Sequence, residues 1–375
     1  MHGGSPVKCD EGRPACDRCV STDRVCDGYP SPFRIVTLEV PTPSTSEPAA
    51  DSQPSLSLYQ PKASIVTADE VNKLAHYFHR NRRATVCYQN EARAILENLW
   101  DPAIRHALNS LCALHDERSH TALTGSRGIF VNQPSLDAYN AAISILATRL
   151  RQEPSRASAQ AALVCCQMFV SIEVIMCDYA NAFQHFLLGL RIMYQYRNRP
   201  AVSSTGSVVP CHNPDFPHLD AFAIKLFASG YPGPRHLSTG QGAQTTGTNT
   251  LLCDQARSDL SALSAQVLEF LSRATDLQSH REAVELQTRR AEILSCLQFW
   301  EQMYSKCVQE IMGEVSSMKL QYSAAFILLL YHVLKVVVTL AMSASPDGAG
   351  EVEDEFHTLT EIASFATELR VGQRV

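Results

Sequence analysis

Four cysteines lie close together near the start of the chain, in the stretch VKCDEGRPACDRCVSTDRVCDGY. They are Cys9, Cys16, Cys19 and Cys26, and gaps of six, two and six residues separate them. Thiolates are zinc ligands, and four of them complete a tetrahedral structural site. The two-residue gap lets two sulfur atoms from one turn reach the same ion. The spacing therefore predicts a metal site, and zinc is favoured over an iron–sulfur cluster.

The segment between the first two of these cysteines, DEGRP, is expected to turn, because Gly12 and Pro14 bend the chain back. A segment as short as residues 1–30 cannot bury a core of its own. Metal binding would therefore have to drive its folding.

The same stretch resembles the later two-thirds of the binuclear zinc cluster, the six-cysteine DNA-binding domain of fungal transcription regulators. Cys9, Cys16, Cys19 and Cys26 match the third to sixth cysteines, and Lys8 matches the end of the preceding basic stretch. In that family six cysteines hold two zinc ions, and a basic helix enters the major groove. The resemblance implies a nuclear, zinc-dependent, DNA-binding regulator of RNA polymerase II transcription, in which Lys8 contacts a phosphate. Its partners would be promoter DNA and the transcription machinery or related regulators.

The sequence departs from the family pattern because it lacks the first two cysteines and nearly all of the basic stretch. Four cysteines cannot form the full cluster, so at most one zinc ion is expected. The resemblance implies that Cys16, Cys19 and Cys26 supply three of its ligands, with Cys9, His2 or water as the fourth. Residues 1–30 carry four Lys or Arg against five Asp or Glu, and this net negative charge disfavours phosphate binding. We expect one bound zinc and weak or no DNA binding.

Two explanations account for the missing part of the cluster. A start codon placed inside the cluster would give a truncated gene model, which is the explanation we favour. Alternatively, a shortened protein would keep only regulatory contacts. It would then be a non-DNA-binding interaction protein, whose helical domain binds a partner regulator or a small effector.

The composition is that of an ordinary globular protein. The chain has 375 residues, of which 45% are hydrophobic and 19% charged, and its net charge is −6. Any nucleic-acid contact must therefore be local. The 13 cysteines are unevenly spread and their number is odd, which favours a reducing compartment over a disulfide scaffold. The first residues contain no apolar signal-peptide core.

The composition divides the chain into three regions. Residues 1–30 form the cysteine module, and residues 31–68, rich in Pro and Ser, are predicted to be a flexible linker. Residues 69–375 show helical periodicity, so an all-α domain is expected. Helices are predicted after Asp101, over 135–153, 158–176 and 178–196, and over 254–278, 281–314, 323–344 and 351–369, with loops over 198–218 and 229–250.

Parts of this helical region also resemble the regulatory domain that follows the zinc cluster in many such regulators. The segment 323–344 is long enough to span a membrane, but His332 and Lys335 near its middle favour a buried core helix. The basic stretch HYFHRNRR, residues 76–83, is read as a solvated helix face and a weak nuclear import signal. No catalytic motif is present, so an enzyme is not expected. No heptad run indicates dimerisation.

Overall fold

The structure is a computed structural model that describes residues 67–68, 71–72, 74–75, 87–124, 133–152, 155–203, 206–228, 246–313, 318–342 and 352–371. The chain divides into two units, Met1–Tyr59 and Gln60–Val375, and all described residues lie in the second. The predicted cysteine module, nearly all of the predicted linker and the basic stretch 76–83 lie outside the described residues. The predicted domain boundaries therefore stay predictions.

The described part of the second unit is all-α, as the helical periodicity predicts. Its helices are α3 (Gln89–Glu97), α4 (Pro102–Thr124), α5 (Gln133–Gln152), α6 (Arg156–Met176), α7 (Tyr179–Gln195), α8 (Leu219–Ala228), α9 (Thr246–Thr275), α10 (His280–Trp300), α11 (Lys306–Gly313), α12 (Met318–Leu340) and α13 (Glu353–Val371). A five-residue π-helical turn, η1 (Glu301–Ser305), joins α10 to α11. The sequence analysis expected one uninterrupted helix there.

A small hairpin interrupts the region that the sequence predicts as a loop. Strands β1 (Ala201–Val202) and β2 (Val208–Val209) pair antiparallel, with Ala201 opposite Val209 and Val202 opposite Val208. Strands of two residues are too short to show an alternating pattern in the sequence. The backbone N–H of Val202 also donates to the carbonyl of Met342, at 2.8 Å, so the hairpin is attached to the end of α12.

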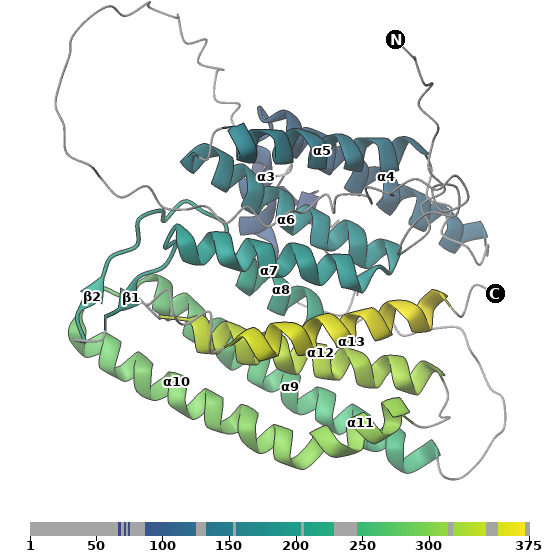
Figure 1. Ribbon diagram of the computed structural model, residues 1–375, viewed down its shortest axis with the longest axis vertical. Coiled ribbons are helices and arrows are strands. Elements are labelled where there is room, and N and C mark those ends of the chain that lie inside the picture. Colours follow the sequence, from purple (N-terminus) through teal and green to yellow (C-terminus); the bar gives the residue numbers. More distant parts are fainter. Residues whose placement is uncertain are drawn as a thin grey trace, which may run out of the picture. The chain divides into compact units, whose positions relative to one another are not determined.

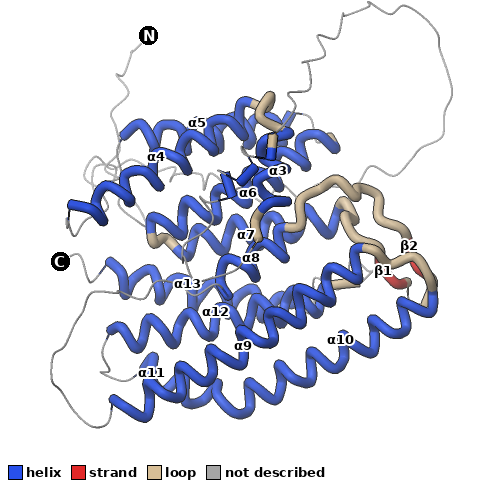
Figure 2. The backbone as a smooth tube through the Cα atoms, turned by 180° about the vertical axis from the view of Figure 1, so that it is seen from behind, coloured by secondary structure: helices blue, strands red, loops and turns tan. Residues whose placement is uncertain are grey.

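The helices of this unit are stacked in successive layers (Figures 1 and 2). Helices α4 and α5 pack together, and α4 lies on α6. Helix α6 pairs with α7, which contacts both α8 and α13. Helix α12 lies between α13 and α9, and α10 packs along α9. This order brings the end of α7, the start of α8 and the end of α12 close together.

Two helices, α6 and α12, form the apolar centre of the unit. Nearly every residue of α6 from Ser158 to Ile175 is buried, so this helix is central. By length and composition, Arg156–Met176 and Leu320–Leu340 could each cross a membrane. However, 89% and 78% of their most apolar windows are buried inside the protein. Helix α12, which covers most of the predicted segment 323–344, is thus a core helix, as predicted.

Side-chain caps define where several of these helices begin. The Asp178 carboxylate accepts from the backbone N–H of Asn181 at the start of α7, as its position in the sequence predicts. Ser155 caps α6 in the same way, through the N–H of Ser158. The carboxylate of Asp101 accepts from the N–H of Ala103, at 2.9 Å, and also pairs with Arg149 of α5. One acidic side chain therefore both begins α4 and binds its neighbour.

Candidate functional site

The residues that the sequence analysis singles out for chemistry lie outside the described part of the chain. They are Cys9, Cys16, Cys19 and Cys26 as zinc ligands and Lys8 as a DNA contact. Within the described ranges, no group of three or more His, Cys, Asp or Glu side chains is placed to hold a metal ion. The zinc and DNA predictions therefore stay predictions. The helical unit itself offers a different kind of site.

That site begins at the end of α7. The turn there holds an arginine in a backbone conformation that usually requires glycine. Arg197 has a φ of 43°, in the left-handed region where helix ends usually carry glycine. The N–H of the next residue, Asn198, donates to the carbonyl of Met193 at 3.3 Å and closes the turn. A side chain in this conformation costs roughly 1–2 kcal/mol. The turn after α7 therefore carries backbone strain at Arg197.

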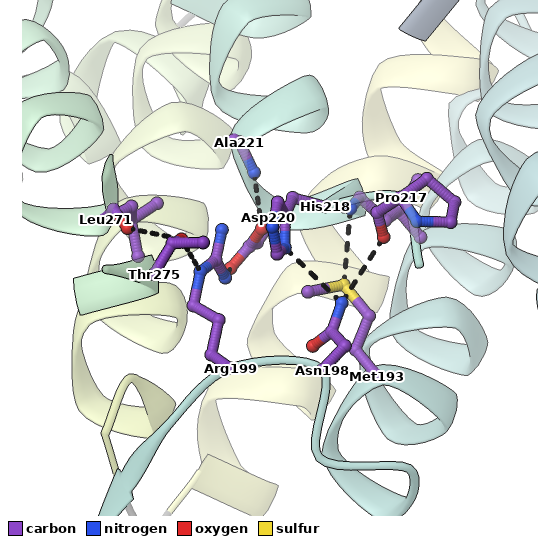
Figure 3. A network of polar contacts seen from close by, with 10 residues as sticks. Met193, Asn198, Arg199, Pro217, His218, Asp220, Ala221, Leu271 and Thr275 are labelled. Atoms are coloured by element: carbon purple, nitrogen blue, oxygen red, sulfur yellow. Dashed lines mark hydrogen bonds and ion pairs between the residues drawn. The ribbon is translucent and has the colours of Figure 1, made fainter. Parts of the chain in front are cut away.

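Arg199 is the next cation of this segment, and it is almost fully buried. Its guanidinium donates through Nη1 to the carboxylate of Asp220 and through Nε to Oγ1 of Thr275, at 3.0 Å (Figure 3). Thr275 in turn donates to the carbonyl of Leu271. Arg199 therefore joins the turn after α7 to the first turn of α8 and to the end of α9.

Asp220 is held as a carboxylate by these contacts. Burial alone would raise its pKa, but the charge and hydrogen bond of Arg199 outweigh burial. The N–H of Ala221, at 2.7 Å, adds to the effect, so the pKa of Asp220 lies below its usual value. A carboxylate in the first turn of a helix also interacts favourably with the helix dipole.

A neutral polar group lies beside this ion pair. Burial, followed by the nearby charge of Arg199, lowers the pKa of His218 to about 4, so the ring is neutral near pH 7. The Asn198 amide lies 3.4 Å from both Nδ1 of His218 and the carbonyl of Pro217 (Figure 3). These contacts fix the loop from which Arg197 and Arg199 project.

A cavity of about 70 Å³ opens against this network. Its walls come from the end of α7, the segment leading into β1, the start of α8 and the end of α12. The residues that line it are Leu190, Met193, Tyr194, Arg197, Asn198, Arg199, Pro200, Ala201, Asp220, Val337, Leu340, Ala341 and Met342. The cavity thus combines two arginines and one aspartate with an apolar wall.

A second buried polar group lies between α5, α6 and α7. The Tyr139 hydroxyl donates to the carboxylate of Glu173 and lies 3.0 Å from Nε2 of His185. Burial raises the pKa of Glu173 to about 7, although the Tyr139 hydrogen bond opposes the shift. Burial also lowers the pKa of His185 to about 4. His185 is therefore a buried core residue with a polar partner.

A third polar group ties α12 to α13. The carboxylate of Glu355 lies 2.6 Å from Nδ1 of His332 and also pairs with Lys335. The hydrogen bond from His332 is the largest of the effects that bring the pKa of Glu355 down to about 2. His332 is thus a paired structural residue.

The adjacent Cys165 and Cys166 on α6 are buried. Burial raises the pKa of Cys166 to about 12, so its thiol is protonated near pH 7. A protonated, buried thiol is a poor nucleophile and a poor metal ligand. These two cysteines act as small apolar side chains in the core.

Comparisons with known proteins give the family of the chain. No family model matches it, and no solved structure matches it. The chain is 31% identical over 400 residues to "Transcription regulator lscL" of Purpureocillium lilacinum, and the match covers 98% of this chain and 92% of lscL. A second relative is the "Aspercryptin biosynthesis cluster-specific transcription regulator atnN" of Emericella nidulans. The two chains are 29% identical over 212 residues, and the match covers 52% of this chain and 33% of atnN. The near-complete match to lscL shows that the chain belongs to a family of fungal transcription regulators.

Proposed function

We propose that this protein is a nuclear, zinc-dependent regulator of RNA polymerase II transcription that acts on promoter DNA. Cys9, Cys16, Cys19 and Cys26 hold one zinc ion, and Lys8 contacts a DNA phosphate. The helical unit controls the activity of this module. The protein has no catalytic role in this account.

The observation that carries the proposal is the extent of the match to lscL. A match over 98% of 375 residues leaves only about 8 residues outside it. The matched span therefore includes the segment around Cys16, Cys19 and Cys26 together with the helical unit. The whole arrangement, a cysteine segment followed by an all-α unit, thus corresponds to a protein named as a transcription regulator.

A second function is favoured by the charge of the cysteine segment. Residues 1–30 carry a net charge of −1, whereas proteins that bind DNA neutralise phosphates with basic residues. On this alternative the protein does not bind DNA itself. It binds a partner regulator or a small effector through the helical unit and modulates related regulators.

Selection of DNA from a random-sequence duplex library by the full chain separates the two functions. The proposal predicts that a sequence motif is enriched, though only weakly because the chain lacks most of the basic stretch, and that a zinc chelator or Cys16→Ser abolishes the enrichment. Lys8→Ala should lower affinity for every sequence and reduce the salt dependence by about one unit of slope. Absence of any enriched motif from a zinc-loaded chain would overturn DNA binding and leave the second function.

A further inference from the structure

The cavity at the end of α7 lies where three helices meet. Leu190 and Met193 come from α7, Val337 and Leu340 from α12, and Asp220 from the first turn of α8. A ligand here would touch all three helices at once. Its presence would therefore stabilise their mutual arrangement.

The described side chains that line this cavity carry more positive than negative charges. Arg199 uses Nη1 and Nε for Asp220 and Thr275, which leaves Nη2 without a partner among the described residues. Arg197 contacts Nε2 of His212 at 3.2 Å but forms no ion pair with a carboxylate in the described part of the chain. Among the described residues that line the cavity, two guanidiniums thus accompany one carboxylate. This leaves one positive charge that no described carboxylate compensates.

The opposite wall of the cavity is apolar. It is formed by aliphatic and thioether side chains, namely Leu190, Met193, Val337, Leu340 and Met342. Most of these residues are buried, so they form a fixed surface rather than a mobile rim. A ligand that fits must therefore present a charged end and a short apolar end.

Backbone strain is concentrated at the same place. Among the described non-glycine residues, positive φ angles occur at Cys177, Arg197 and Met342, and two of these three line the cavity. Arg197 contributes a cation and Met342 contributes apolar surface. Strained residues that persist in a fold cluster at ligand sites, where the side chain is needed in that position.

We propose that this cavity binds a small amphipathic monocarboxylate. The carboxylate pairs with the guanidiniums of Arg197 and Arg199, and the apolar end lies on the wall formed by Met193 and Met342. A guanidinium offers parallel N–H donors that suit a carboxylate. A dianion such as phosphate is disfavoured, because the cavity supplies only one uncompensated charge and Asp220 would repel the second. The volume of about 70 Å³ suits a ligand of a few heavy atoms.

This inference goes beyond the proposed function and does not depend on zinc. Every residue described as lining the cavity belongs to the helical unit. A chain that fails to bind zinc or DNA would therefore still bind the carboxylate. The two proposals can fail separately.

Methyl NMR of the full chain with ¹³C-labelled methionine tests the proposal. The chain has 8 methionines, of which Met193 and Met342 line the cavity and Met303 is exposed elsewhere. Butyrate should shift the signals of Met193 and Met342 in a saturable way and leave Met303 unchanged. Butylammonium and inorganic phosphate at the same ionic strength should produce no saturable shift.

Arg197→Gly provides the matched variant, because glycine adopts the left-handed conformation without strain. Its melting temperature should equal or exceed that of the wild-type chain, while its affinity for butyrate falls at least tenfold. The proposal is overturned by any of three results: unmoved Met193 and Met342 signals, an equal response to butylammonium or phosphate, or unchanged affinity in Arg197→Gly.

Discussion

The guanidinium of Arg199 pairs with the carboxylate of Asp220 across the junction between the turn after α7 and the first turn of α8. Both side chains are at least 90% buried. The pair therefore fixes the relative position of two helices whose ends form the cavity wall. Its two members are 21 residues apart in the chain.

Arg199→Ala should destabilise the chain strongly. Removing one partner of a buried ion pair leaves the other charge buried and unpaired, which costs about 3–5 kcal/mol. Thr275→Val, which removes the hydrogen bond from Nε of Arg199 and the one to the carbonyl of Leu271, should cost about 1–2 kcal/mol. Urea denaturation followed by circular dichroism measures both changes.

The exposed pair formed by Arg156 and Asp215 supplies the control for this experiment. The two side chains are 57% and 75% exposed and lie 3.2 Å apart. Exposed pairs contribute about 0–1 kcal/mol, so Arg156→Ala should change the stability little. Equal losses in Arg199→Ala and Arg156→Ala would contradict the structural role of the Arg199–Asp220 pair.

Glu173→Gln should change how stability depends on pH. The pKa of Glu173 is raised from 4.5 to about 7 in the folded chain. The stabilisation of the fold by protonated Glu173 is therefore fully present below pH 4.5 and is lost as the pH rises towards 7. The glutamine variant removes this loss and should be more stable than wild type at pH 8, by an amount on the order of 3 kcal/mol. Denaturation at pH 5 and pH 8 measures the difference.

The neutral glutamine retains a side-chain oxygen that can accept from Tyr139, so the variant tests charge rather than shape. Below pH 5 the two chains should be similarly stable. A constant difference between wild type and variant from pH 5 to pH 8 would show that Glu173 does not titrate in this range.

Glu355→Gln should act in the opposite direction and in a lower pH range. The pKa of Glu355 is lowered from 4.5 to about 2, mainly by the hydrogen bond with His332. Its stabilising effect is present above pH 4.5 and is lost as the pH falls towards 2. The variant should be less stable than wild type at neutral pH, and the two curves should converge in acid. Curves that stay parallel down to pH 2 would exclude this contribution.

Gly189→Ala tests the close approach of α7 to α8. A Cβ atom built at Gly189 would lie 2.0 Å from Cδ2 of Leu219, which is fully buried. Overpacking of this kind costs about 1–3 kcal/mol. Leu219→Ala should therefore cost less in the Gly189→Ala background than in the wild type. A double-mutant cycle measured by denaturation checks this coupling, and strict additivity would contradict it.

The elements with strong local signals could be predicted from the sequence. Helix α7 follows Asp178, which caps it, and α6 is apolar on nearly all sides, so it had to be central. The start of α9 was placed too late, because residues before Asp254 show little apolar periodicity. Helix α8 was not predicted from periodicity either, since its ten residues are apolar nearly all round.

The cavity could not be predicted, because its charged residues come from segments without a common period. Arg199 lies in a loop and meets Asp220 and Thr275 only through the packing of α8 and α9. The left-handed conformation of Arg197 gives no sequence signal either, since glycine is the residue expected there. The cysteine segment differs from the cavity. Its metal site is predicted from the spacing of the cysteines alone, and the segment lies outside the described residues.

The zinc content of the purified full chain, measured by elemental mass spectrometry, tests the central claim most directly. We predict one zinc ion per chain, which is lost in Cys16→Ser/Cys19→Ser. It should be retained in Cys87→Ser, which changes an exposed cysteine outside the segment. A value of zero or two zinc ions for the wild-type chain, or retention of zinc in the double variant, would contradict the account.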